Sequence, residues 1–546
     1  MQFQYKYHGN TAIANTPTSV GMSFVPDVYR QPTFFAGKLR KHIAFREAMS
    51  ALHDVVIADL RYTPKDRTAY KAWAAEQEDI WLADMMEEAS GVNAQIQEIR
   101  AELEGLRKEK YTVMESFYTA QNKYFKYLYR KNYIAWLVLD PVITVHPDEL
   151  FFECFSRDES SYGKLGCDYD MFKEIHECEC GTTNIDYSAH LYNEFQKIRE
   201  YKETGFIVDP IGFSVQTTGE SDYKEVKIDL PDSWVRGFLQ VSSAMTLPAR
   251  TFDLHPMDMY NFLFLLKRQK EKESPRSMRY ILKPGEPVKV VFEPWNHEVV
   301  CSRSIYKGNE ETEVRVWGRR RLFILERLIP VAKRFTISLL GTGMPSFYIA
   351  DLGDMNFTLG LSGWTANDWT RMGNFDLMAP RAETEPMTQQ TVYTALRENW
   401  VEDADSLSNR LNLDRKTVLG ALSAFTQAGR AIFDLNKKVF RIRELSREAL
   451  PVDRLRFANE REASANHFID RKAVTLKSST GTDGTLRLSG TVKDKKTKYK
   501  PELLIDSDER LAQATCTCNF YTQNKLYKGP CEHMLALRIR HSREKV

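Results

Sequence analysis

The sequence lacks a long apolar run, and this absence excludes the commonest kind of membrane protein. No segment approaches the roughly 20 consecutive apolar residues that a membrane-spanning helix needs, because even IAWLVLDPVITV is interrupted by Asp140 and Pro141. The first residues also lack a basic stretch followed by an apolar one, so we expect no secretory signal peptide. These absences predict a soluble, cytoplasmic protein without a membrane partner.

Cysteine is scarce and the net charge is close to zero. Eight cysteines in 546 residues are too few for a disulfide framework, and two pairs of them are separated by a single residue, which favours reduced thiols. The formal charge of +2 marks no global preference for a charged partner. The exception is local, because residues 471–546 contain 16 Lys/Arg and 8 Asp/Glu. This end is either an anion-binding surface or a solvated tail.

Motifs for common enzyme chemistry are also missing. The sequence has no GxxxxGK[ST] loop for a nucleotide, no HExxH, no GxSxG and no glycine-rich turn from a strand into a helix. Asp158, Glu159 and Ser160 lie together in FSRDESSYG, but adjacent carboxylates on a loop are more typical of a turn than of an acid/base pair. We therefore expect no catalytic centre and no small-molecule substrate.

The chain does contain the material for several folded units. Hydrophobic content of 42% and charged content of 27% are ordinary for globular proteins, and 546 residues exceed what one core usually supports. The patterns predict an α+β multidomain protein with five parts: a mixed N-terminal region (1–68), a helical hairpin or coiled coil (69–133), a β-rich body of one or two units (134–377), a winged helix-turn-helix-like unit (389–445) and a zinc-finger region (470–546).

The helical segment has a clear seam. Apolar and aromatic residues from Ile96 to Tyr127 alternate steps of three and four over more than four heptads, with Lys110 at the one position that breaks the pattern. This is typical of a helix that buries one stripe against another helix. The stretch from Ala69 to Ala89 is the obvious antiparallel partner within the chain. The alternative is an arm used for oligomerisation or for docking a partner.

Short β-branched and aromatic runs separated by Pro, Gly, Asn and Asp predict the β-rich body, interrupted by one helix over about 257–269. A proline-containing linker follows at 379–390. Beyond it the pattern predicts helices over 391–400, over 405–411 and after Asp414, and a hairpin that turns at Asn436 and Lys437.

Three short helices and a hairpin are the layout of a winged helix-turn-helix. Arg415 and Lys416 then begin the recognition helix, and Lys437, Lys438, Arg441 and Arg443 lie on the wing, where they could reach phosphates. Residues 389–445 contain 9 basic and 7 acidic residues, which is weakly basic for a DNA reader. The unit is therefore either a DNA-binding or a protein-binding module.

The C-terminal end carries the strongest chemical signal. Cys516 and Cys518 are followed, after twelve intervening residues, by Cys531 and His533. A structural zinc ion takes four nitrogen or sulfur ligands in a tetrahedron and leaves no position open for catalysis. The pattern predicts one structural Zn²⁺ bound by these four residues; the alternative is a coincidental cysteine cluster.

This arrangement resembles the SWIM zinc finger, which has Cys-x-Cys, a variable spacer and Cys-x-His on a ββα scaffold. The resemblance covers about residues 470–541. SWIM fingers occur in transposases, plant transcription regulators and helicase-associated proteins, so it implies DNA or protein binding. The wider chain also resembles bacterial SWIM proteins that accompany MoxR-type AAA+ ATPases and von Willebrand A-domain proteins, through 151–163, 181–188 and the C-terminal end.

Two further sets of residues are candidate sites. Cys167, His176, Cys178 and Cys180 could form a second metal site, although buried structural cysteines are the alternative. Lysines around the zinc pattern predict sequence-tolerant binding of DNA or other nucleic acid: Lys493, Lys495, Lys496, Lys498, Lys500, Lys525 and Lys528. The alternative function is an adaptor subunit in an AAA+ ATPase and A-domain assembly.

Overall fold

The computed structural model of the chain contains two compact units, one formed by 1–58 with 139–546 and the other by 59–138. The second unit lies almost entirely outside the described residues, so the helical hairpin or arm over 69–133 stays a prediction. The described residues are 12–15, 19–24, 34–59, 141–175, 178–184, 203–208, 232–270, 275–364, 367–370, 373–380, 384–445, 460–481, 484–495 and 497–545, with a few single residues between 192 and 201.

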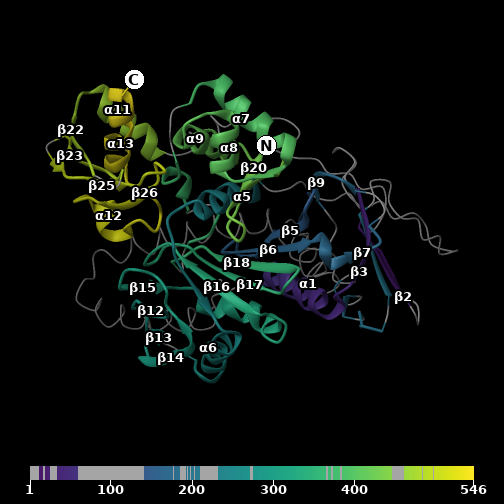
Figure 1. The fold of residues 1–546 in the computed structure, drawn as a ribbon. Coiled ribbons are helices and arrows are strands. Elements are labelled where there is room, and N and C mark those ends of the chain that lie inside the picture. Colours follow the sequence, from purple (N-terminus) through teal and green to yellow (C-terminus); the bar gives the residue numbers. More distant parts are fainter. Residues whose placement is uncertain are drawn as a thin grey trace, which may run out of the picture. The chain divides into compact units, whose positions relative to one another are not determined.

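Two sheets come first along the chain (Figure 1). One has the order β1-β2-β10-β3-β7, and β8 also pairs with β3; its strands are β1 (Ala12–Asn15), β2 (Ser19–Phe24), β3 (Phe34–Leu39), β7 (Phe172–Lys173), β8 (Cys178–Glu179) and β10 (Glu203–Val208). The other has the order β11-β16-β17-β18-β6-β5-β4-β9; its strands are β4 (Val142–Val145), β5 (Glu149–Phe155), β6 (Ser161–Asp168), β9 (Gly181–Asn184), β11 (Arg250–Leu254), β16 (Arg334–Leu339), β17 (Ser346–Asp351) and β18 (Met355–Leu361).

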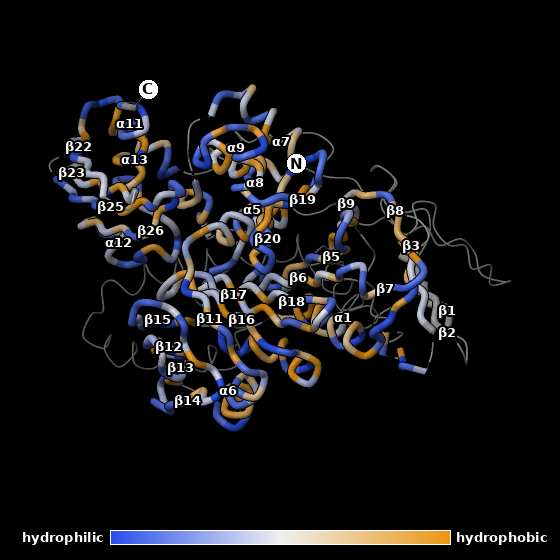
Figure 2. The backbone as a smooth tube through the Cα atoms, viewed as in Figure 1, coloured by the Kyte–Doolittle hydropathy of each residue, from blue (hydrophilic) through white to orange (hydrophobic). Residues whose placement is uncertain are grey.

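Helix α1 (His42–Ile57) packs on β5 and β6 of the eight-stranded sheet. Its apolar face, which includes Phe45, Leu52 and Val55, is fully buried. Gly163 in β6 makes this approach possible, because a Cβ atom there would lie 3.0 Å from Val55 Cγ2. Figure 2 shows that hydrophobic and hydrophilic residues alternate along α1.

A third sheet has the order β14-β13-β12-β15 and contains β12 (Met278–Leu282), β13 (Pro287–Phe292), β14 (His297–Ile305) and β15 (Thr312–Val316). The predicted helix over 257–269 is present as α6 (Pro256–Arg268). Helix α5 (Asp232–Met245) was not predicted. The 3-10 segments η1 (Tyr169–Met171), η2 (Arg319–Leu328) and η3 (Phe375–Leu377) connect the sheets.

Residues 386–442 contain the predicted three helices and hairpin: α7 (Pro386–Asn399), β19 (Val401–Glu402), α8 (Ala404–Leu411), α9 (Arg415–Gln427), β20 (Ala431–Asp434) and β21 (Val439–Ile442). Asp403 caps α8, and Asp414 caps α9 by accepting a hydrogen bond from Lys416 N. Helix α7 begins earlier than predicted, because Pro386 occupies its first turn, where proline costs no hydrogen bond. These elements enclose a separate small core.

The C-terminal part contains a five-stranded sheet of order β22-β23-β25-β26, with β24 paired to β23. Its elements are α11 (Glu460–Asp470), β22 (Val474–Thr480), β23 (Leu486–Asp494), β24 (Thr497–Tyr499), β25 (Glu502–Ile505), β26 (Leu511–Thr515), α12 (Asn519–Asn524) and α13 (Glu532–Lys545). Its buried residues continue the hydrophobic cluster of the body. Within the described part of the chain, every helix is too short or too polar to cross a bilayer.

Candidate metal centre and basic surfaces

The first pair of predicted ligands follows strand β26. Cys516 comes directly after the strand, and Cys518 is the N-cap residue of α12. The sulfur of Cys518 accepts a hydrogen bond from Tyr521 N at 3.4 Å. Because a helix N-terminus stabilises negative charge, this position favours the thiolate form that binds metal.

The second pair is placed by the start of α13. Cys531 immediately precedes the helix, and His533 lies in its first turn. Gly529 turns the chain toward the helix with a φ of 82°, and a Cβ atom there would lie 2.5 Å from Asn374 O. A glycine is therefore required both by the backbone conformation and by the close contact.

These four side chains form one compact, buried group. Their ligand atoms all lie within 4.8 Å of one another, and each side chain is at most 7% exposed. Neither ring nitrogen of His533 has a hydrogen-bond partner of ordinary geometry, apart from the surrounding cysteine sulfurs. Three buried sulfurs around such an imidazole match the donor set of a structural zinc ion. The predicted ligands are thus brought together.

Two aromatic residues hold the imidazole in place. The ring of Phe468, from α11, stacks on His533 with centroids 5.5 Å apart and an interplanar angle of 15°. Tyr499, at the end of β24, lies 4.2 Å from the same ring. Residues that orient a ligand tune its metal site. Neither residue was predicted, because they lie 65 and 34 positions before the histidine and outside the Cys-x-Cys and Cys-x-His ligand patterns.

The spacer between the two ligand pairs contacts the body. The ring of Tyr527 stacks on Trp364 at 5.5 Å, with planes 3° apart. Asn367 Nδ2 donates to Tyr527 O at 2.9 Å, and Arg461 donates to Lys528 O and Pro530 O at 3.0 and 2.8 Å. The conformation of the spacer is therefore fixed by the body as well as by the ligand group.

The predicted basic residues near the finger occupy different places. Lys493 and Lys498 lie opposite each other in the β23–β24 hairpin, and Lys495 lies at its turn with a φ of 51°; all three are exposed. Lys496 lies outside the described residues. Lys525 is exposed, with its ammonium 5.1 Å from the ring of Tyr521, and Lys528 is half-buried.

The basic residues of the 386–442 unit are largely paired. Arg415 contacts Asp405 and Asp508, and Lys437 contacts Asp148, Glu149 and Asp168. Lys416 and Lys438 are exposed. A role in binding stays a prediction for all four, although the charges of Arg415 and Lys437 already have carboxylate partners.

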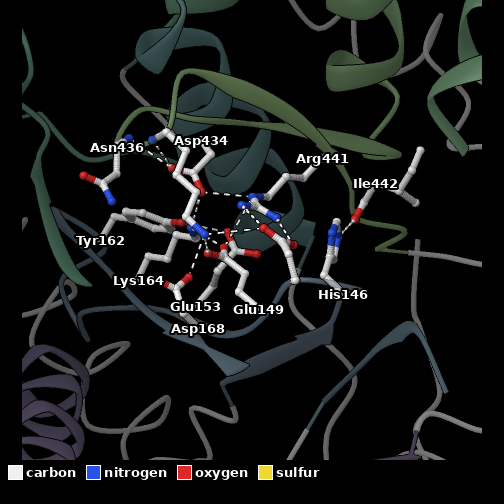
Figure 3. A network of polar contacts seen from close by, with 12 residues as sticks. His146, Glu149, Glu153, Tyr162, Lys164, Asp168, Asp434, Asn436, Arg441 and Ile442 are labelled. Carbon is white, nitrogen blue, oxygen red and sulfur yellow. Dashed lines mark hydrogen bonds and ion pairs between the residues drawn. The ribbon is translucent and has the colours of Figure 1, made fainter. Parts of the chain in front are cut away.

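The contacts of Lys437 belong to a larger polar network between the β20–β21 hairpin and the sheet strands β4, β5 and β6 (Figure 3). The guanidinium of Arg441 binds both carboxylate oxygens of Asp148, at 2.7 and 3.0 Å, and Asp434 at 3.0 Å. The buried ammonium of Lys164 lies 3.0 Å from Asp434. The side chain of Arg443 pairs with Glu153 at 3.3 Å, and both are fully buried.

This network keeps two of its carboxylates, those of Asp148 and Asp434, ionised. Although burial of Asp148 opposes ionisation, hydrogen bonds from Arg441 hold the pKa of that carboxyl at about 2. The partners Lys164 and Arg441 lower the pKa of Asp434 in the same way, against its burial. Bidentate Arg–carboxylate pairs fix geometry as well as charge, so they hold the hairpin against the sheet.

His146 makes this contact sensitive to acid. Its Nε2 contacts Ile442 O, and burial, with the charge of Arg441, lowers the pKa of His146 from 6.5 to about 4. Between these values the unfolded chain binds a proton that the folded chain excludes, so stability falls as the pH falls. From pH 7 to pH 5 we expect a loss of about 2 kcal/mol from this group.

Replacement of His146 with glutamine removes the titrating group but keeps a hydrogen-bond donor. We expect the difference in unfolding free energy between pH 7 and pH 5 to shrink by about 2 kcal/mol in this variant. Urea unfolding followed by tryptophan fluorescence measures it, because Trp400 lies 5.4 Å from His146. Equal pH dependence in both proteins would contradict the assignment.

The second predicted cysteine cluster is only partly described. Cys167 is fully buried in β6, whereas Cys178 is exposed and Cys180 is half-buried. Among the described residues, the C-terminal group is the one set of three or more His, Cys, Asp or Glu close enough to share an ion. Cys167, Cys178 and Cys180 therefore do not form such a set by themselves, and His176 lies outside the described residues.

Comparison with known proteins identifies the C-terminal finger. Residues 499–539 match the model of the SWIM zinc finger family, and this range contains all four ligands. The chain thus carries a SWIM zinc finger whose ligand group fits one zinc ion. No curated protein matches the chain.

Solved structures match part of the chain at low similarity. The structure of Proliferating Cellular Nuclear Antigen from Entamoeba histolytica is 11% identical, with a TM-score of 0.29, over 41% of this chain and 89% of that one. A structure of A. fulgidus PCNA with the C-terminal region of FEN-1 is 13% identical, with a TM-score of 0.28, over 43% and 93% of the two chains.

Proposed function

We propose that the chain is a non-enzymatic zinc-finger protein that binds nucleic acid, with little dependence on base sequence, through one face of its five-stranded sheet. The observation that carries the proposal is the pairing of Lys493 directly opposite Lys498. Like charges placed opposite each other destabilise a hairpin. A ligand with closely spaced negative charges would offset that cost.

The same face carries further basic residues. In the sheet register, Thr491 lies opposite Thr475, Ser489 opposite Lys477, and Arg487 opposite Ser479. Alternate residues of a strand share a face, so Lys477 and Arg487 lie on the side that presents Lys493. All four are exposed, and among the described residues none of them has a carboxylate within ion-pair distance. Glu502 is the one acidic residue on this side of the described sheet.

The opposite face of the sheet is covered by the zinc-bearing helix. Leu537 of α13 approaches Gly490 in β23 so closely that a Cβ atom on the glycine would lie 2.8 Å from Leu537 Cδ1. The helix that carries the ligands therefore packs on one face of the sheet, and the opposite, basic face stays exposed to solvent. Phosphate contacts of this kind position nucleic acid without reading its bases.

The unit formed by 386–442 supports a different role. Its order of helices and strands is that of a winged helix, and we propose that it is one. Its recognition helix α9 packs on α5, and its wing residues Lys437, Arg441 and Arg443 are engaged by carboxylates of the body. We therefore propose that this winged helix makes protein contacts within the chain.

Salt dependence of binding tests the nucleic-acid proposal. Four or five phosphate contacts predict that log K falls against log salt with a slope of about −4 on duplex DNA. Replacing Lys477, Lys493 and Lys498 with glutamine should flatten the slope by about 3 and weaken binding to every duplex alike. Fluorescence anisotropy at 50 to 200 mM salt measures both effects.

A matched control replaces Lys270 and Lys307, which are exposed on the body, with glutamine and should leave the slope unchanged. Zinc content must be equal in all three proteins. Absence of binding to duplex and single strands at low salt, with zinc bound, would exclude the proposal.

An adaptor role is the second candidate. It is favoured by helix α6, which exposes Met257, Tyr260 and Phe264 at spacings of three and four. The rings of Tyr260 and Phe264 stack with centroids 6.1 Å apart. Exposed apolar residues grouped on one face are typical of protein contacts. A complex with an AAA+ ATPase or an A-domain protein that survives nuclease would favour this role.

A further inference from the structure

Only two of the eight cysteine thiols reach the surface. Cys154, Cys167 and Cys301 are buried, and burial raises the pKa of each of these thiols. The three cysteines of the zinc group are also buried. Cys178 is exposed and Cys180 is half-buried. Reaction with a solute should therefore be confined to these last two.

The two thiols lie where the chain passes from one sheet to the next. Cys178 pairs with Phe35 in the six-stranded sheet, and Gly181 pairs with Val145 in the eight-stranded sheet. Strands β8 and β9 are labelled in Figure 2, and Cys180 is the single residue between them in the chain. Residues two apart on an extended chain point to the same side, so the side chains of Cys178 and Cys180 are neighbours, and interaction with the Cys180 thiol lowers the pKa of Cys178.

Tyr169 contacts the pair from a fixed position. Its ring stacks on Phe35 with centroids 5.4 Å apart. Its hydroxyl lies 3.2 Å from Cys178 Sγ and also contacts His146 O. One hydroxyl proton cannot serve both acceptors. A thiolate is the stronger acceptor because the bond is charge-assisted, so ionisation of Cys178 turns the hydroxyl toward sulfur.

The electrostatic surroundings distinguish the two sulfurs. Hydrogen bonds from Cys180 and Tyr169 lower the pKa of Cys178 to about 6, against the effects of burial and Glu179. The same thiol contact, with burial and the charges of Glu179 and Asp148, raises the pKa of Cys180. Cys178 is also the more exposed of the two and the one that Tyr169 contacts, so we assign it as the attacking sulfur and Cys180 as its neighbour.

We propose that Cys178 and Cys180 form a reversible redox switch, in which a hydroperoxide oxidises the two thiols to an internal disulfide. The Cys178 sulfur attacks one peroxide oxygen, the O–O bond breaks, and the departing oxygen takes a proton to leave as water or an alcohol. Cys180 then loses its proton and attacks the sulfenic sulfur of Cys178. The S–O bond breaks and water leaves. Two thiols supply the two electrons that the peroxide accepts.

The geometry predicts that this disulfide is easily reduced. Residues two apart on an extended strand have Cα atoms about 6.6 Å apart, near the upper end of the usual disulfide range of about 4.4–6.8 Å. The Cβ atoms of two such residues, which lie on one side of the chain, must also approach to about 3.5–4.5 Å, so closing the bond strains the chain at the passage between the sheets. A strained, exposed disulfide has a more oxidising potential than a structural one, so cellular thiols would reopen it.

The test treats the full-length, zinc-loaded protein with equimolar hydrogen peroxide, blocks the remaining thiols and identifies the products by peptide mass spectrometry. We expect loss of 2 Da in the peptide that contains Cys178 and Cys180, with Cys154, Cys167 and Cys301 still reduced and zinc retained. Dithiothreitol should restore both thiols. In Cys180→Ser, Cys178 should instead accumulate as a sulfenic acid that dimedone traps.

The rate at which hydrogen peroxide oxidises the pair at pH 6 distinguishes a thiol with a lowered pKa from an ordinary thiol. A thiol with a pKa of about 6 is about half ionised there, and an ordinary one is about 0.3% ionised. Lower intrinsic nucleophilicity offsets most of this gain, which leaves about a tenfold advantage over the isolated peptide. Tyr169→Phe should lose part of the advantage, whereas Cys301→Ser should keep all of it.

Two outcomes would overturn the proposal. One is a folded protein whose pair reacts no faster than the peptide or forms no internal disulfide. The other is a second equivalent of zinc in the wild type that disappears in Cys178→Ser, which would show a metal site that includes His176.

Discussion

Replacing Cys518 with serine or His533 with alanine is expected to lower the zinc content from about one ion per chain to nearly none. Four buried ligands close the site, so the loss of one leaves an incomplete shell that water would have to fill. Apparent binding free energies of structural zinc in small finger peptides are about 10–16 kcal/mol. Losing even part of this binding free energy should unfold the segment around the ligands, because a short segment has few other stabilising contacts.

The loss should spread beyond the finger. The spacer between the ligands is stacked on Trp364 and hydrogen-bonded by Asn367, so faster hydrogen exchange should appear near 367–377 as well as at 516–533. Cys301→Ser, a buried change elsewhere, should keep the metal. Unchanged metal content in both ligand variants would refute the zinc assignment.

Replacing Arg441 with alanine is expected to destabilise the 386–442 unit by about 3–5 kcal/mol. The change removes the guanidinium that contacts Asp148, Glu149 and Asp434 together. The last two of these are almost fully buried, and among the described residues the ammonium groups of Lys164 and Lys437 are then the cations left for three carboxylates. Removing one member of a buried ionic group costs much more than the pair contributes, because the remaining charges stay desolvated. Urea unfolding followed by circular dichroism and tryptophan fluorescence measures the change.

Arg334→Ala is the matched control, because Arg334 pairs with Asp351 at the surface and is 59% exposed. Such pairs contribute about 1 kcal/mol or less. Arg441→Lys keeps the charge but loses the two-point contact, so its effect should fall between the other two. Similar small losses in Arg441→Ala and Arg334→Ala would show that the network does not hold the hairpin.

Sequence patterns located the zinc ligands because the ligands of this site lie close together in the sequence. Cys516 and Cys518 are one residue apart, as are Cys531 and His533, and the coordination chemistry of zinc limits what four such residues can do. The elements of 386–442 were also predicted, because helix caps such as Asp414 and the turn after Asp434 depend on the residue types at neighbouring positions.

The rest depended on contacts between distant residues. Lys437 and Arg441 look available for phosphates, but their partners at 148–168 lie more than 260 positions earlier in the chain. The same holds for Arg538, a basic residue five positions after the last zinc ligand, which is buried and donates to backbone carbonyls. Charge in a sequence says nothing about where its counter-charge lies.

Secondary structure was missed where local signals conflict. Helix α5 contains Gly237 and two adjacent serines, which are weak helix formers. Its apolar residues Trp234, Phe238 and Val241 form a buried face, so tertiary packing decides the conformation. Pro386 was interpreted as part of a linker, although proline is equally suited to the first turn of a helix.

The contacts of Arg538 make the finger dependent on the rest of this chain. This side chain of α13 donates to Leu377 O and Ala379 O, about 160 positions earlier, and to Glu509 O. A finger excised from the chain would leave a guanidinium in an apolar surface with two of its three carbonyl acceptors gone. If domain shuffling transferred this finger to another protein, the segment that contains Leu377 and Ala379 would have to be transferred with it, or Arg538 would have to be replaced. Related chains that carry the finger in another setting should therefore replace Arg538 with a neutral residue.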